Sequence, residues 1–187
     1  MRAFANIIKL NKRNLSRGAL AGGFTKQGLQ HYASHFWEED VCAPYTDLFS
    51  KNISFECCEW LDNHHDPSSE LATSLFGSTR FVPERLLMTP FCEQTELPAF
   101  KANDQYLVWE VTMKAPHEII CSFEVIGMKG LTMMGFDPRT RRVFLGSCID
   151  NQSSQRTGFT SMVPLHCSYS QYLLQGLTET LESKTVR

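Results

Sequence analysis

The stretch that decides the fold runs from residue 106 to 149 and reads YLVWEVTMKAPHEIICSFEVIGMKGLTMMGFDPRTRRVFLGSCI. Apolar and polar residues alternate along most of it, and this period of two predicts strands with one buried face. The predicted strands cover residues 106–114, 118–125, 130–136 and 142–149. Pro116 and Pro138 lie in connections of hairpin length, which favour tight turns. Four consecutive strands with short turns predict an antiparallel meander.

A long amphipathic helix is predicted after the meander, over residues 166–185. Apolar residues recur there at intervals of three and four, a spacing that places them on one side of a helix. They are Tyr169, Tyr172, Leu173, Leu177 and Leu181. Gly176 falls beside this stripe, where the absence of a side chain permits the close approach of a neighbouring element.

Shorter elements are predicted before the meander. Alternation around residues 53–58 favours a first strand. A helix is expected from Ser69 to Phe76, with Ser68 or Ser69 as its cap, and a second helix with Pro83 in its first turn and residues 86–88 on its apolar side. Residues 27–37 also have helical character.

These elements predict one α+β domain of residues 38–187, in which the antiparallel meander curves around the long C-terminal helix and short helices precede the sheet. The helix must bury its apolar stripe, and the apolar face of the sheet is the surface available for this. The length of 187 residues suits one core of ordinary size.

The first 37 residues differ from the rest in charge. They hold six basic and no acidic residues, whereas the remainder holds twelve basic against 20 acidic residues, a net charge of −8. On a helical wheel, apolar residues 4, 7, 8 and 15 lie opposite basic residues 2, 9, 12, 13 and 17. This pattern is typical of a mitochondrial transit peptide. The alternatives are a membrane-surface helix, a solvated basic arm and an extra helix packed on the domain.

The leader predicts a location in the mitochondrial matrix, and without such a leader the domain would be cytoplasmic. The acidic body argues against nucleic acid as a partner, because phosphate binding needs a basic face. No apolar run approaches the 18 residues that a transmembrane helix needs. Seven cysteines without framework spacing fit reduced thiols.

The order of elements resembles the START-like, or helix-grip, superfamily, which includes polyketide-cyclase-like domains. Locally the resemblance rests on KANDQYLVWEV, APHEIICSFEV, the DPRTR hairpin and LHCSYSQYLL, and it covers about residues 45–181. It implies a cavity between the curved sheet and the closing helix, suited to a lipid, polyketide, sterol or aromatic ligand. The expected function is therefore binding of a hydrophobic or amphipathic small molecule without transforming it.

The candidate ligand-binding residues are those predicted on the inner face of the sheet and of the last helix. They are Trp109, Val111, Met113, Cys121, Phe123, Met133, Leu145, Tyr172, Leu173 and Leu177. Methionines would give such a cavity an adaptable wall. The plain alternative is that these side chains fill one another's space as core.

No catalytic residue, metal ligand or cofactor is assigned. Cys57-Cys58 with His64-His65-Asp66 lack the spacing of a zinc site, and His166-Cys167 lack a nucleophile elbow. A pocket enzyme of cyclase or hydrolase type remains an alternative, working through polar groups among Glu110, Glu124, His117, Tyr169 and Tyr172. The third alternative is an assembly protein that docks a partner on the sheet or the final helix.

Overall fold

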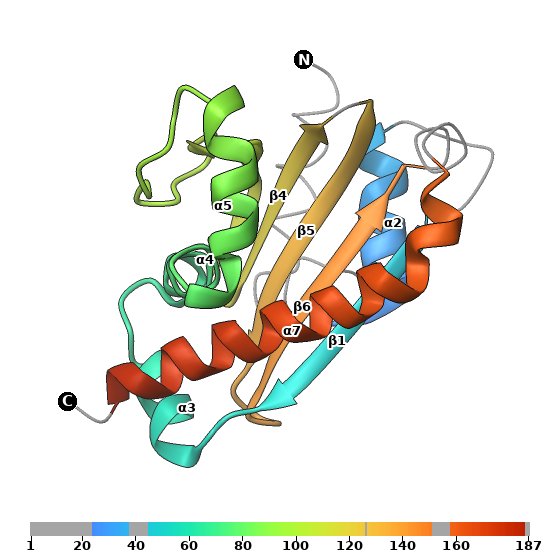
Figure 1. Cartoon of the computed structure of the whole chain (residues 1–187). Coiled ribbons are helices and arrows are strands. Elements are labelled where there is room, and N and C mark those ends of the chain that lie inside the picture. The colour runs from blue at the N-terminus through green and yellow to red at the C-terminus, as the bar shows by residue number, and fades with distance from the viewer. Residues whose placement is uncertain (1–23, 38–44, 126, 151–157, 186–187) are drawn as a thin grey trace.

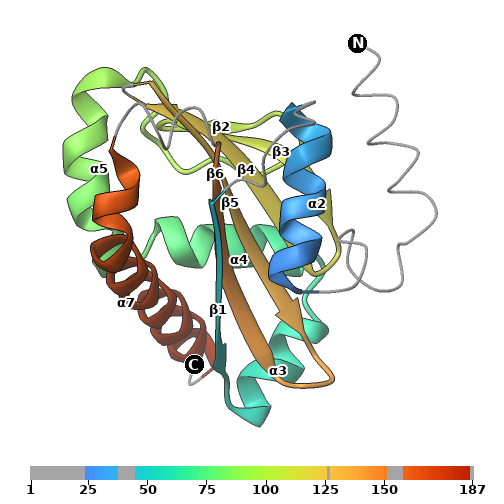
Figure 2. The same ribbon diagram turned by 90° about the vertical axis from the view of Figure 1, so that its right-hand side faces the viewer.

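The computed structural model describes residues 24–37, 45–125, 127–150 and 158–185. The amphipathic part of the predicted leader, with its predicted targeting role, lies outside these residues. Within them, a six-stranded antiparallel sheet carries helices on both faces (Figures 1 and 2). The predicted α+β class is confirmed.

The sheet consists of β1 (Tyr45–Asn52), β2 (Gln105–Tyr106), β3 (Trp109–Ala115), β4 (Glu118–Val125), β5 (Met128–Asp137) and β6 (Arg142–Ile149). Its order is β1-β6-β5-β4-β3-β2, so β3 to β6 form the predicted four-stranded meander and the short β2 is added at its edge. β1 comes first in sequence and pairs with the last strand, with Tyr45 opposite Ile149. The long stretch between β1 and β2 therefore leaves the sheet and returns at its far edge, which is where the short helices form.

The C-terminal helix α7 (Phe159–Thr185) crosses one face of the sheet (Figure 1). Leu177 and Leu181 are fully buried and belong to one core cluster with Val111 and Val143 of the sheet. The prediction of a meander closed by a long helix is confirmed, although the helix begins at Phe159 rather than at His166.

The helices before the meander differ in part from prediction. They are α3 (Phe55–Asp62), α4 (Pro67–Phe76), the 3₁₀ turn η1 (Thr79–Phe81), α5 (Val82–Met88) and the 3₁₀ turn η2 (Thr89–Phe91). The predicted strand at 53–58 is wrong: Ser54 Oγ accepts the Cys57 N–H at 3.1 Å and so begins a helix. Cys57 and Leu61, four residues apart, are both buried, which is helical spacing. The cap of α4 is Asp66, whose Oδ1 accepts the Ser69 N–H at 3.2 Å.

Helix α2 (Lys26–Trp37) covers the opposite face of the sheet, and Figure 2 shows the sheet edge-on between α2 and α7. Leu29 and Ala33 are fully buried there. The Phe24 ring stacks on Phe144 with centroids 4.6 Å apart and lies over Gly135, where a Cβ would come within 2.2 Å of the ring. Residues 24–37, which the sequence interpretation placed in the leader, therefore pack on the sheet.

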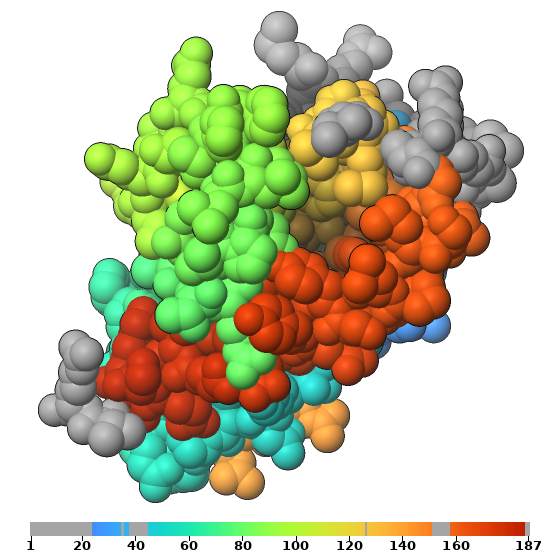
Figure 3. Space-filling model, viewed as in Figure 1, coloured from blue at the N-terminus to red at the C-terminus, as the bar shows by residue number. Residues whose placement is uncertain are grey.

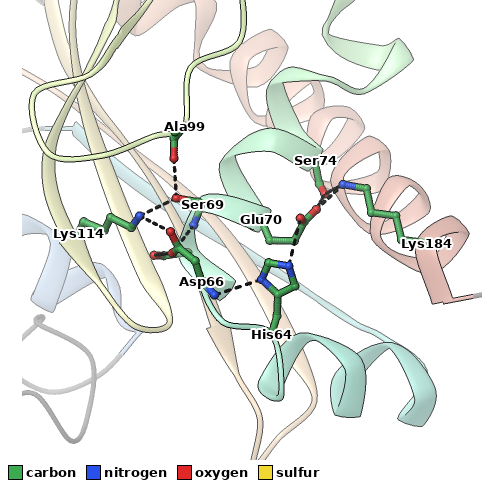
Figure 4. A network of polar contacts seen from close by, with 9 residues as sticks. His64, Asp66, Ser69, Glu70, Ser74, Ala99, Lys114 and Lys184 are labelled. Carbon is green, nitrogen blue, oxygen red and sulfur yellow. Dashed lines mark hydrogen bonds and ion pairs between the residues drawn. The ribbon is translucent and has the colours of Figure 1, made fainter.

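Two clusters of polar contacts, one around Lys114 and one around Lys184, hold helix α4 in place (Figure 4). Lys114 Nζ of β3 donates to Asp66 Oδ2 and to Ser69 Oγ, each at 2.6 Å. On the other side, Lys184 of α7 forms an ion pair with Glu70. These contacts hold α4 between the sheet and α7, so that Leu75 and Phe76 at its end reach the cavity described next.

Candidate ligand-binding site

A cavity of about 200 Å³ lies between the sheet and helices α5 and α7. Figure 3 shows the surface hollowed between these two helices, with atoms of the sheet at its floor. The described lining is mostly apolar: Leu75, Phe76, Phe81, Met88, Val108, Trp109, Phe123, Val125, Met128, Leu145, Ile149, Phe159 and Leu173. Its polar side chains are Glu84, Thr132, Ser147, His166, Tyr169 and Ser170. Such a lining, apolar with a few convergent polar groups, is typical of small-molecule sites.

Trp109 is the centre of an aromatic wall. Its ring centroid lies 5.4 Å from Phe81, 5.5 Å from Phe76 and 6.0 Å from Phe123. Trp109 Nε1 donates to Thr132 Oγ1 at 3.1 Å, which fixes the orientation of the indole. Gly130 makes room for Phe123, because a Cβ there would lie 2.3 Å from the Phe123 ring. The aromatic wall is thus held in place by the hydrogen bond from Trp109 to Thr132 and by the space that Gly130 leaves for Phe123.

One polar group joins β1, β6 and α7 beside the cavity. The Ser147 N–H and hydroxyl donate to Asp47 Oδ1 at 3.0 and 2.7 Å. His166 Nε2 lies 2.8 Å from Ser147 Oγ and 3.1 Å from Asp47 Oδ2. Tyr45 Oη donates to Asp47 Oδ2 at 3.3 Å and lies 3.3 Å from Cys167 Sγ. Every oxygen of the buried Asp47 carboxylate therefore has a partner.

Charge and hydrogen bonding keep Asp47 ionised. Burial alone raises its pKa, but the hydrogen bonds from His166 and Ser147 and the charge of His166 outweigh burial and lower the pKa below its ordinary value. Burial, the contact with Cys167 and the negative charge of Asp47 raise the pKa of Tyr45. The group is therefore an ionised acid surrounded by donors.

A second polar group is formed by Glu84 of α5 and Tyr169 of α7. Glu84 Oε2 and Tyr169 Oη are both buried, and neither has a hydrogen-bond partner among the described residues. Burial raises the pKa of Glu84, and the nearness of the Tyr169 hydroxyl lowers it only in part. Burial and then Glu84 raise the pKa of Tyr169. The two groups are thus near enough to influence each other without a well-formed hydrogen bond.

The geometry argues against hydrolytic chemistry at His166. In a serine triad, the acid binds one ring nitrogen of histidine and the serine binds the other. Here Ser147 and Asp47 both contact Nε2, and the Ser147 hydroxyl donates to Asp47. Nor do three His, Cys, Asp or Glu side chains gather as metal ligands anywhere in the described ranges.

The structure places the ten predicted ligand-binding residues in four settings. Trp109, Phe123, Leu145 and Leu173 line the cavity. Val111, Cys121 and Leu177 lie in the adjoining core. Met113 and Met133 pack under α2 on the opposite face of the sheet, and Tyr172 is 42% exposed.

The three misplaced residues have physical causes. The register of β3 shifts between Val111 and Met113, so Met113 turns to the other face of the sheet. Met133 lies opposite Ile120, which also faces α2. Tyr172 packs its ring under the guanidinium of Arg80, 4.6 Å from the ring centroid. Arg80 also occupies the space beside Gly176, which confirms the close approach predicted there.

Most residues of the predicted enzyme alternative lie away from the cavity. Glu110 and Glu124 are exposed, and His117 Nε2 lies 3.4 Å from Asp62 on the surface. Only Tyr169 of that set lines the cavity. The polar lining comes instead from residues that the sequence interpretation did not combine: Glu84, Ser147 and His166, with Asp47 behind them.

For two of these polar residues, Asp47 and Glu84, the sequence contains a pattern that could have identified them. Asp47 has the same parity as Tyr45 and Phe49 in a short strand, and an acid at an inward position indicates a buried, paired carboxylate. Glu84 precedes Met88 by four residues, so both lie on one side of α5. Nothing in the sequence pairs Asp47 with His166, because the contact depends on how α7 crosses the sheet.

Comparison with protein-family models, with curated proteins and with solved structures gives no match. Within the described parts of the chain, no helix is long and apolar enough to cross a membrane. Inferences about function therefore rest on the cavity itself.

Proposed function

We propose that this protein binds a small hydrophobic molecule in the cavity between the sheet and α7. The observation that supports this most is a cavity of about 200 Å³, open to the surface between α5 and α7, whose lining is mostly apolar. Concave sites with a mostly apolar lining and a few polar groups are the usual form of small-molecule sites. The START-like resemblance predicts a ligand in the same place.

The volume restricts the ligand. An engineered cavity of about 150 Å³ accommodates benzene, whereas drug-sized ligands need about 300 Å³ or more. A cavity of about 200 Å³ suits a single ring or a short branched chain. Of the ligand classes expected from sequence, the aromatic one fits this volume better than a sterol or a long lipid chain.

The test is an NMR titration of ¹⁵N-labelled protein with toluene, supported by native mass spectrometry of gently purified protein. Toluene should shift the Trp109 indole N–H and the amides of residues that line the cavity, while residues of α2 stay unchanged. If toluene shifts no cavity residue up to its solubility limit, and no adduct copurifies, the protein is not a carrier of small hydrophobic molecules.

Docking of a protein partner is the second candidate, and exposed apolar side chains favour it. Leu86 of α5 is 72% exposed, Phe91 of η2 is 83% exposed, and Leu165 of α7 is 65% exposed. Contiguous apolar patches on a surface indicate interaction sites, and we propose that these side chains belong to one. Replacing Leu86 and Phe91 with serine should then abolish concentration-dependent association in light scattering. If the wild-type protein stays monomeric at all concentrations, self-association through this surface is ruled out.

The matrix location is a separate proposal that rests on the basic leader. Residues 1–23 fused to a fluorescent protein should direct it into mitochondria. The same fusion with Lys9, Lys12 and Arg13 changed to glutamine should remain in the cytosol, because import depends on the basic face of the helix. A wild-type fusion that stays cytosolic would refute the transit role.

A further inference from the structure

Glu84 and Tyr169 line the cavity from α5 and α7, and we propose that its ligand is a small hydrophobic amine whose cationic nitrogen binds these two side chains. This inference rests on the proposed function, because it assigns a chemical class to the ligand of the same cavity. It is supported by two buried oxygens without a hydrogen-bond partner among the described residues, by the lack of an ion pair to Glu84 among those residues, and by the aromatic wall.

The unpartnered oxygens are Glu84 Oε2 and Tyr169 Oη. Both are buried, and among the described residues neither has a hydrogen-bond partner. A buried polar atom without a partner destabilises a protein, so such atoms are rare unless a ligand or water completes them. A donor with several N–H bonds, placed between the two side chains, would satisfy both oxygens at once.

The charge around Glu84 favours a cation. Glu84 forms no ion pair with the described residues, whereas acids such as Asp66, Glu70 and Glu179 do. The neighbouring Arg85 donates from Nη2 to the Phe76 carbonyl at 2.6 Å, and its buried Nε has no hydrogen-bond partner among the described residues, so neither nitrogen bonds to Glu84. Burial raises the pKa of Glu84, and an ammonium group beside it would favour the ionised form.

The aromatic wall provides the second attraction. Trp109 is surrounded by Phe76, Phe81 and Phe123 at centroid distances of 5.4 to 6.0 Å. The faces of aromatic rings carry partial negative charge, so they attract ammonium groups as well as apolar bodies. A carboxylate beside aromatic rings therefore selects a cationic ligand over an anionic one. The volume of about 200 Å³ limits such an amine to about one ring with a short chain.

The experiment compares three probes of nearly equal shape: benzylamine, which is cationic at pH 7, benzyl alcohol, which is neutral, and toluene. Each is titrated into wild-type protein, Glu84→Gln and Tyr169→Phe, with the Trp109 indole N–H as the NMR readout. Wild-type protein should bind benzylamine at least about tenfold more tightly than benzyl alcohol, since hydrogen bonds to charged groups contribute more than neutral ones.

The variants should separate charge from shape. Glu84→Gln should remove the preference for benzylamine while the affinity for toluene changes less than about twofold, because the volume is conserved. Tyr169→Phe should weaken benzylamine about three- to tenfold and leave toluene unchanged, because it deletes one hydrogen bond. Melting curves establish that each variant is folded.

The outcomes distinguish the two proposals. If toluene binds but benzylamine binds no more tightly than benzyl alcohol, the amine inference fails and the hydrophobic cavity stands. If none of the three probes shifts the Trp109 signal, both fail. The wild-type preference is decisive even if Glu84→Gln does not fold, because it compares probes within one protein.

Discussion

His166 Nε2 lies 3.1 Å from Asp47 Oδ2, so the first half of α7 is joined to β1, the edge strand that precedes it by more than 100 residues in sequence. Asp47 is 2% exposed and also accepts two hydrogen bonds from Ser147 of β6. One carboxylate thus connects the edge of the sheet, the neighbouring strand and the closing helix. Together with the ion pairs of Lys184 with Glu70 and of Arg80 with Glu179, this contact positions α7 over the sheet.

Asp47→Ala should destabilise the protein by about 2–4 kcal/mol, because it leaves the donors of Ser147 and the ring of His166 without an acceptor in a buried place. Asp47→Asn is the matched control, since its amide oxygen still accepts from Ser147, and it should cost about 1 kcal/mol. Urea unfolding measures both. Equal costs for the two variants would show that the hydrogen bonds are not what stabilises this junction.

Helix α2 should be essential to the domain. Leu29 is fully buried against the sheet, so Leu29→Ala should cost about 2–4 kcal/mol through lost burial and the space left behind. Leu86→Ala, at a position that is 72% exposed, should change stability by less than about 0.5 kcal/mol. Thermal melting measures both variants.

A pair of truncations tests the same helix. Removal of residues 1–23 should leave a folded protein, whereas removal of residues 1–37 should expose Leu131 and Met133 and cause unfolding or aggregation. Size-exclusion chromatography and circular dichroism distinguish these states. A stable, monomeric protein beginning at residue 38 would show that α2 is dispensable.

The sequence predicted the meander well because its signal is local. The period-two alternation located β4 at residues 118–125 and β6 at residues 142–149, as the structure has them. The prediction from alternation was wrong at two places, where a single residue alters the local backbone. The register shift after Val111 reverses the side of Met113, and Ser54 begins a helix where alternation suggested a strand.

The cavity was less predictable than the sheet. Four of its lining residues follow from strand parity and the helix stripe, namely Trp109, Phe123, Leu145 and Leu173. Its polar groups come from segments far apart in sequence, and they meet only because α5 and α7 lie on opposite sides of the opening. Neither the nearness of Glu84 to Tyr169 nor the contact of Asp47 with His166 leaves a local pattern in the chain.

Filling the cavity should abolish binding without harming the fold. Leu173 is partly buried and lines the cavity, so Leu173→Trp would place a larger side chain in the space of about 200 Å³. Cavity-filling changes typically stabilise a protein by about 0.5–2 kcal/mol. We expect an unchanged or raised melting temperature and at least a tenfold loss of toluene affinity in the NMR titration. Retained affinity would place the toluene site elsewhere.

Acid should destabilise the protein between about pH 4 and pH 2, partly through Asp66. Burial alone raises the pKa of Asp66, but hydrogen bonds from Lys114 and Ser69 outweigh it and lower the pKa from 3.8 to about 2. A lowered pKa means that the unfolded chain binds the proton first. The stabilisation is therefore complete above about pH 4 and is lost as the pH falls through about 2. Because the Asp66 side chain is 30% exposed, solvent screening limits the effect to about 1 kcal/mol.

Asp66→Asn isolates this charge, because asparagine is as good a helix cap as aspartate and preserves the start of α4. The variant should be less stable than wild type at pH 7 by about 1 kcal/mol, and the difference should shrink as the pH approaches 2. Lys114→Gln should raise the pKa of Asp66 toward 3.8 and move the loss of stability to higher pH. Urea unfolding at several pH values measures the stability of both variants. If the difference in stability between Asp66→Asn and wild type stays constant from pH 7 to pH 2, the stabilisation comes from the helix cap rather than from the charge.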